Sequence, residues 1–205
     1  MSLDKPVNGP RARVVREGRR NLDEMARALN PLDPLIAWRR KAPRASKLYG
    51  AIVAQARLPS LYQDYGLPDT LEGRFAAVSL HLFAVLDHLK ADGPRARDLA
   101  QALTDRFSED MEIVLRELGV SDLRIPKKMR ALAASSAALL ETYEKAFAAG
   151  EGAFVDAIAQ SLPLEGDAAM HTAARLAAYL REVMHALRGQ TITDIEAARL
   201  PEVRA

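Results

Sequence analysis

Glu182 and His185 are the pair of residues whose spacing in the sequence suits metal ligands. An i,i+3 separation on a helix places a carboxylate and an imidazole on the same face, as in helical bundles that hold two iron ions. Those bundles need this motif twice, together with two further glutamates, and the sequence contains it once. We therefore expect no metal and no other cofactor, and a metal-dependent helical enzyme is kept only as an alternative.

Other kinds of catalytic site have less support. The chain of 205 residues contains no cysteine, which excludes a cysteine nucleophile, a thiolate metal site, an iron–sulfur cluster and a disulfide scaffold. No Gly-x-Ser-x-Gly elbow indicates a serine nucleophile, and no P-loop or Gly-x-Gly-x-x-Gly turn indicates a nucleotide site. The sequence therefore predicts a protein that is not an enzyme.

Charged and aromatic side chains gather instead around the predicted turns. The set comprises Tyr49, Arg57, Tyr62, Asp69, Arg74, Phe75, Asp110, Arg116 and Asp122. An aspartate caps the free N–H groups at a helix start and an arginine bridges carboxylates, so these residues are compatible with locked helix ends. Aromatic side chains ringed by arginine are also typical of protein-binding hot spots. Composition by itself does not separate the two interpretations.

His81 lies seven residues after Arg74 and seven before His88, along one flank of a predicted helix. A histidine at such a boundary is most often a hydrogen-bonded residue at the edge of the core. The alternative is a polar strip that faces another protein. Both interpretations stay open at this point.

Charge is divided unevenly along the chain. Residues 1–47 hold 12 Lys and Arg against 5 Asp and Glu, whereas the remainder holds 17 against 22. Residues 1–20 combine arginines with Pro6, Gly9 and Pro10 and few large apolar residues, which predicts a flexible, disordered basic tail. Such a tail attracts anions, and RNA and anionic lipid headgroups both qualify. The alternative is a solubilising tail without a dedicated partner.

Helices must position the remaining residues. Between Pro and Gly punctuation, apolar residues recur at steps of three and four and predict helices over 34–41, 46–58, 70–92, 94–118, 126–149, 154–162 and 167–188. On the 70–92 helix, the predicted core-facing residues are Leu71, Phe75, Val78, Leu82, Val85 and Leu89. We therefore expect an all-α, compact multi-helix domain of antiparallel helices over 46–190. Short helices or a linker at 21–45 precede it and a C-terminal tail at 191–205 follows it.

Two long blocks carry a family resemblance. Residues 48–62, followed by 65–75 with Leu80 and His81, form the first block, and residues 110–129 form the second. In order and spacing, these blocks closely resemble the ubiquinol–cytochrome c chaperone family. The similarity covers roughly residues 46–150, and the C-terminal third follows more loosely.

This resemblance implies a non-catalytic assembly factor for the respiratory cytochrome bc1 complex that binds immature cytochrome b or another subunit of the complex. The resemblance also implies a possible small partner subunit, and DNA is not expected as a partner. Our hypothesis from the residues themselves is a protein-binding surface that contains Tyr49, Arg57, Tyr62, Asp69, Arg74 and Phe75, with His81 on its flank, while Asp110, Arg116 and Asp122 order the adjoining turn. Lys127, Lys128 and the N-terminal arginines would supply an anion-seeking edge for the membrane surface or the ribosome. The absence of a transit peptide indicates a bacterial member in the cytoplasm, or peripheral at the inner face of the cytoplasmic membrane. An alternative is a helical protein that associates with the membrane, the ribosome or RNA through its basic tail.

Overall fold

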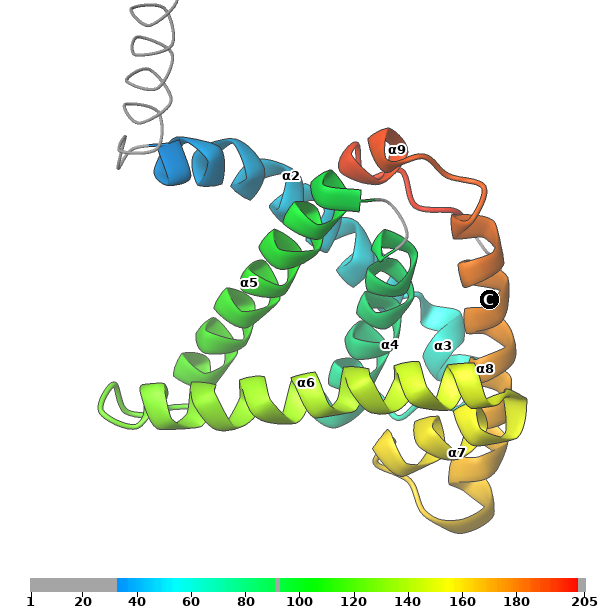
Figure 1. The fold of residues 1–205 in the computed structure, drawn as a ribbon. Coiled ribbons are helices and arrows are strands. Elements are labelled where there is room, and N and C mark those ends of the chain that lie inside the picture. Colours follow the sequence, from blue (N-terminus) through cyan, green and yellow to red (C-terminus); the bar gives the residue numbers. More distant parts are fainter. Residues whose placement is uncertain (1–32, 91–92, 203–205) are drawn as a thin grey trace, which may run out of the picture. The chain divides into compact units, whose positions relative to one another are not determined.

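The computed structural model describes residues 33–90 and 93–202, with side chains from residue 43 onward. Helices joined by short loops make up this described part, and it contains no strand (Figure 1). The predicted all-α fold class is therefore confirmed. The predicted basic tail at residues 1–20 lies outside the described residues, as do residues 21–32 of the segment 21–45.

The described helices follow one another closely along the chain. They are α2 (Asp33–Ala56), α3 (Pro59–Gln63), α4 (Leu71–Leu89), α5 (Gly93–Glu117), α6 (Ile125–Ala149), α7 (Glu151–Ser161), α8 (Gly166–Leu187) and α9 (Ile192–Glu196). The chain divides into two units, Met1–Arg40 and Lys41–Ala205, and the helices from α3 to α9 all belong to the second. None of the described helices is both long enough and apolar enough to cross a bilayer.

Helix α2 corrects one expectation. The sequence predicted separate helices over 34–41 and 46–58, but a single helix runs through Pro43. A proline inside a helix removes one backbone hydrogen bond, yet it does not force the chain to turn when packing holds the next turns in place. Leu48, Ile52 and Ala56 are fully buried after Pro43, and their burial stabilises this part of the helix.

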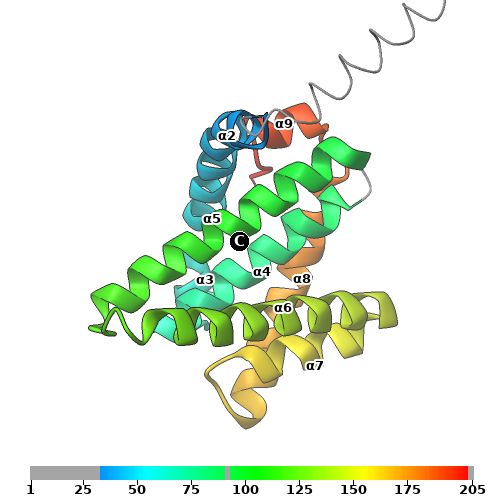
Figure 2. The ribbon, with the colours of Figure 1, turned by 60° about the vertical axis from the view of Figure 1, so that its left-hand side comes forward.

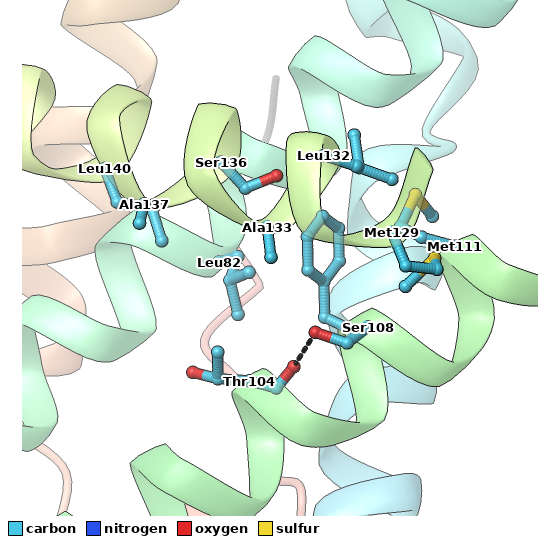
Figure 3. Close-up of a pocket in the computed structure, with 11 residues that line it drawn as sticks. Leu82, Thr104, Ser108, Met111, Met129, Leu132, Ala133, Ser136, Ala137 and Leu140 are labelled. Carbon is cyan, nitrogen blue, oxygen red and sulfur yellow. Dashed lines mark hydrogen bonds between the residues drawn. The ribbon is translucent and has the colours of Figure 1, made fainter. Parts of the chain in front are cut away.

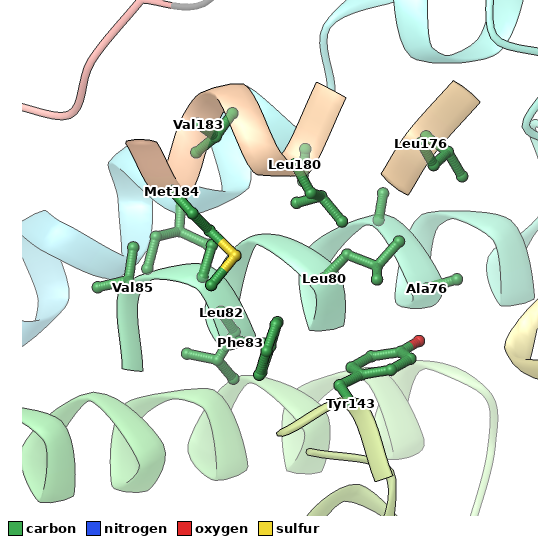
Figure 4. Packing of buried hydrophobic residues seen from close by; sticks show 14 of the residues in the cluster. Ala76, Leu80, Leu82, Phe83, Val85, Tyr143, Leu176, Leu180, Val183 and Met184 are labelled. Atoms are coloured by element: carbon green, nitrogen blue, oxygen red, sulfur yellow. The ribbon is translucent and has the colours of Figure 1, made fainter. Parts of the chain in front are cut away.

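Helix α4 lies at the centre of the hydrophobic core and contacts α5, α6 and α8. Its side chains are buried on several faces, and Leu80, Phe83 and Val85 pack against residues of α6 and α8 (Figure 4). The prediction of one narrow core-facing stripe was therefore wrong in part, because Leu71 is 51% exposed whereas Leu80 and Phe83, outside the stripe, are buried. A helix covered on several sides needs no single apolar stripe.

The last helices close the other side of α4. Helix α7 contacts both α6 and α8, and α8 packs against α4 (Figure 2). Residues 191–202, expected to form a tail, contain α9, which begins with a capping box between Thr191 and Asp194. Ile195 of α9 is fully buried in the core, and Glu196 pairs with Arg95 of α5 and Arg44 of α2. The domain boundaries as a whole stay a prediction.

Candidate protein-binding surface

Four of the predicted site residues line one open groove. Arg57 follows the end of α2, Tyr62 lies in α3, Asp69 lies in the loop before α4 and Arg74 lies in its first turn. The groove has a volume of about 560 Å³ and is lined by Arg57, Pro59, Tyr62, Gln63, Leu67, Asp69 and Arg74. The structure thus brings these four residues together, and their role in binding stays a prediction.

Contacts within the groove fix three of these four side chains. The Tyr62 hydroxyl donates to the backbone oxygen of Ala56 at 2.7 Å, and Arg74 Nε donates to Asp69 Oδ1 at 2.6 Å. The Arg74 guanidinium lowers the pKa of Asp69, and burial raises the pKa of Tyr62. Arg57 is exposed and forms no ion pair with any residue that the structure describes, so its charge is available to a partner.

The start of α4 sets the far wall of the groove. Thr70 is the N-cap, and its hydroxyl accepts a hydrogen bond from the N–H of Gly73 at 3.1 Å. Gly73 packs directly against the carbonyl oxygen of Pro68, where a Cβ atom would overlap the backbone. A side chain at residue 73 therefore cannot be accommodated without moving the loop that carries Asp69.

Tyr49, Phe75 and Asp110 form a packed cluster beneath the surface. The Tyr49 hydroxyl donates to Asp110 Oδ2 at 2.9 Å, and Arg106 Nη2 lies 3.4 Å from Asp110 Oδ1. The Phe107 ring lies between those of Tyr49 and Phe75, at centroid distances of 6.3 and 6.1 Å. Burial and the neighbouring Asp110 carboxylate raise the pKa of Tyr49. These side chains join α2, α4 and α5, and Tyr49, which is 4% exposed, is not accessible to a partner.

His81 is also inside the core rather than on a surface, at 3% exposure. Its Nδ1 lies 2.8 Å from the Ala77 carbonyl oxygen, and its Nε2 lies 3.0 Å from the Tyr179 hydroxyl of α8. Because a carbonyl oxygen only accepts, Nδ1 carries the proton and Nε2 accepts from Tyr179. Burial lowers the pKa of His81 to about 4, so the ring is neutral at pH 7. The structure thus favours the core-edge interpretation of this histidine.

Arg116 and Asp122 meet at the turn between α5 and α6. Arg116 pairs with Asp122 across the turn and with Glu112 on its own helix, the latter at 2.8 Å. Lys127 and Lys128 lie in the first turn of α6, exposed, and no ion pair of either is found among the residues described. The arginine therefore orders the turn, whereas the two lysines keep free charges.

Two features were missed by the sequence analysis. One is an apolar cavity of about 120 Å³ between α4, α5 and α6, lined by Leu82, Thr104, Phe107, Ser108, Met111, Met129, Leu132, Ala133, Ser136, Ala137 and Leu140 (Figure 3). The other is a group of exposed apolar side chains near the α5–α6 turn: Ile113 is 49% exposed, Leu118 60% and Leu123 95%. The sequence signal for these exposed side chains was a leucine within a charged turn. Helical periodicity does not assign such a leucine to the core.

Glu182 and His185 were the candidate ligands of the alternative metal-dependent enzyme. Glu182 and His185 are both exposed on α8. In the described part of the chain, no three His, Cys, Asp or Glu side chains come together as a group that could hold a metal ion.

Comparisons with known proteins bear on the whole described fold. Residues 63–202 match the family model described as "Ubiquinol-cytochrome C chaperone". A solved structure titled "Crystal structure of the Cbp3 homolog from Brucella abortus" aligns with a TM-score of 0.71 and 30% sequence identity, over 83% of this chain and 96% of that chain. A search of curated proteins returned no match.

Proposed function

Because the chain belongs to the ubiquinol–cytochrome c chaperone family, a family that serves assembly of the cytochrome bc1 complex, we propose that it binds immature cytochrome b as a non-catalytic chaperone. The observation that carries this proposal is the open groove between α2, α3 and α4. It combines the free Arg57 charge with the partly buried Tyr62 ring and the apolar Leu67. A mixed aromatic and arginine lining is typical of surfaces that recognise proteins.

The chemistry of the groove supports binding rather than turnover. Arg74 lowers the pKa of Asp69, Asp69 raises the pKa of Arg74, and burial raises the pKa of Tyr62. A general acid or base works best with a pKa near the operating pH. All three shifts move the pKa values further from pH 7. Each group therefore keeps one protonation state, which suits recognition.

The aromatic cluster that joins α2, α4 and α5 also supports the proposal. Tyr49, Phe107 and Asp110 join α2 to α5, and Phe75 joins α4 to the same aromatic contact. A binding surface that is held by packed elements loses less conformational entropy when a partner docks. We assign Tyr49, Phe75, Asp110 and the buried His81 to this supporting role, and we assign Arg57, Tyr62, Asp69 and Arg74 to contact with the client.

The predicted tail adds a second contact to this proposal. Residues 1–20 contain Arg11, Arg13, Arg16, Arg19 and Arg20, and we propose that they hold the chaperone near the ribosome or the anionic inner face of the membrane. A chain shortened by residues 1–20 is expected to keep cytochrome b binding in solution and to show weaker salt-sensitive association with those surfaces. A small partner subunit belongs to the same proposal.

The test of the groove uses Arg57→Glu combined with Gln63→Glu in the full chain. Neither side chain makes a hydrogen bond or ion pair with another described residue, so the fold is expected to stay intact. Crosslinking in cells during bc1 assembly, followed by quantification of captured cytochrome b, is expected to show a marked loss. Arg97→Glu on α5 combined with Gln160→Glu on α7 is the charge-matched control, since both side chains are exposed. Capture equal to that of the parent chain would contradict the proposal.

A further inference from the structure

The exposed apolar side chains of the described chain concentrate at one place. Of the five large hydrophobic residues that are exposed there, Ile113, Leu118 and Leu123 flank the turn between α5 and α6. Figures 1 and 2 show this turn at the end of the helix pair, away from α7 and α8. Gly119, with a φ of 79°, makes the tight reversal after α5. The leucines on either side of it therefore project from a convex end rather than into a groove.

Basic side chains surround these leucines on the α6 side. Arg124, Lys127, Lys128 and Arg130 are all exposed, while Ile125 is buried and Met129 half-buried on the opposite side of the helix. None of the four cations forms an ion pair with another described residue. The partial positive charge at the N-terminal end of the 25-residue helix α6 adds to theirs.

Nearby carboxylates offset part of this charge, because Arg106 and Arg116 each pair with two of them. Asp110 and Glu109 pair with Arg106, whereas Glu112 and Asp122 pair with Arg116. Among the described residues from 109 to 130, Glu117 is the acidic side chain that has no ion pair. The four free cations and the exposed leucines thus define one surface, which we name the hairpin tip: Ile113, Leu118, Leu123, Arg124, Lys127, Lys128 and Arg130.

From this arrangement we infer that the hairpin tip docks on an anionic lipid membrane, with Leu118 and Leu123 entering the headgroup layer. Lys and Arg side chains near an anionic surface each gain electrostatic attraction, and apolar side chains that enter the interface add hydrophobic free energy. A protein partner would have to offer a pocket for a leucine on a protruding turn, whereas a lipid surface accepts a convex tip. The charge complementarity and the convex placement together favour the membrane.

Docking through the hairpin tip leaves the groove uncovered. The groove is built from the end of α2, from α3 and from the start of α4, whereas the hairpin tip is built from the end of α5 and the start of α6. A chaperone for a membrane subunit gains from two separate surfaces, because the hairpin tip can bind the lipid while the groove binds the client. The inference concerns lipid binding by the purified chain and can fail without affecting the proposed client.

The first test is flotation of the full chain with vesicles of phosphatidylglycerol and phosphatidylcholine in equal parts, and with pure phosphatidylcholine. The parent chain is expected to float with the anionic vesicles only. Lys127→Glu with Lys128→Glu is expected to weaken this binding at least about tenfold, because each cation near an anionic surface contributes a factor of about five. Leu118→Ser with Leu123→Ser is expected to weaken it by about tenfold through loss of buried apolar area.

Matched controls separate the hairpin tip from general effects. Lys47→Glu with Arg97→Glu gives the same change in net charge elsewhere, and Leu71→Ser with Met170→Ser removes two other exposed apolar side chains. Both controls are expected to bind within about twofold of the parent, since they lie outside the surface that contacts lipid. The basic tail is present in every chain, so differences between them report the hairpin tip.

The second test places a reporter in the predicted insertion site. Since the chain has no cysteine, Leu123→Cys provides a single thiol for an environment-sensitive dye, and Met170→Cys provides the control. A blue shift with anionic vesicles is expected at residue 123 and not at residue 170. The inference is overturned if the parent does not bind anionic vesicles, if either hairpin variant binds like the parent, or if the dye at residue 123 does not shift.

Discussion

The hydroxyl of Tyr49 on α2 donates to Asp110 on α5 at 2.9 Å, although 61 positions separate the two residues in the sequence. Arg106 completes the contact, since it pairs with Asp110 and its guanidinium lies 5.4 Å from the centre of the Tyr49 ring. This interaction fixes the end of α2, where the groove begins, against a helix that also forms the hairpin tip.

Removal of this hydrogen bond should lower stability without altering the surface. Tyr49→Phe is expected to reduce the free energy of unfolding by about 1 kcal/mol, because the partly buried Asp110 carboxylate loses a donor. Urea denaturation measures the change. In a double-mutant cycle with Asp110→Asn, the two effects should be less than additive. Full additivity would mean that the hydroxyl and the carboxylate do not interact.

Stability should depend on pH through His81. Its pKa in the folded chain is about 4, below the ordinary value of 6.5, so the unfolded chain binds a proton more readily between these values. The free energy of unfolding is therefore expected to be highest above pH 6.5 and to fall by roughly 3 kcal/mol as the pH drops to 4.

The histidine's share can be isolated by substitution. His81→Leu should remove most of that slope, while His185→Gln, at an exposed position of α8, should leave it unchanged. Denaturant titrations at a series of pH values measure both variants. A slope that survives in His81→Leu would assign the pH dependence to other groups.

The close approach at the start of α4 makes Gly73 sensitive to substitution. Gly73→Ala is expected to lower the free energy of unfolding by at least about 2 kcal/mol, because the new Cβ overlaps the Pro68 carbonyl oxygen. Gly50→Ala is the matched control. No atom lies within 4 Å of its Cβ position in helix α2, so alanine there should raise stability by about 0.5–1 kcal/mol. Thermal unfolding would distinguish the two, and equal effects would contradict this account.

Helix α9 should depend on one carboxylate. Glu196 Oε1 accepts from Arg95 Nε at 2.7 Å, and Arg95 holds the pKa of Glu196 below its ordinary value. Glu196→Gln is expected to speed amide hydrogen exchange in residues 192–199 while α8 keeps its protection. In the parent chain the same loss should occur as the pH falls through the lowered pKa of Glu196. Glu202→Gln, at an exposed residue beyond α9, is the control, and equal exchange in all three chains would contradict the prediction.

Helices and their ends were largely determined by local sequence. Thr70 caps α4, and α5 and α6 end at Glu117 and Ala149, within one residue of the predicted ends at 118 and 149. Helix periodicity and capping depend on residues within four positions of one another, so they can be recognised along the chain. The same long blocks of sequence carried the family resemblance, which the match over residues 63–202 confirms.

Only the tertiary structure decided which of the polar and aromatic residues face a partner. Tyr49 and Tyr62 are both tyrosines in the same block, yet the first is buried by α5 and the second lines an open groove. His81 is covered by α8, and Leu123 is covered by nothing in the described chain. Burial depends on elements that lie far away in the sequence, and no local pattern specifies where those elements pack.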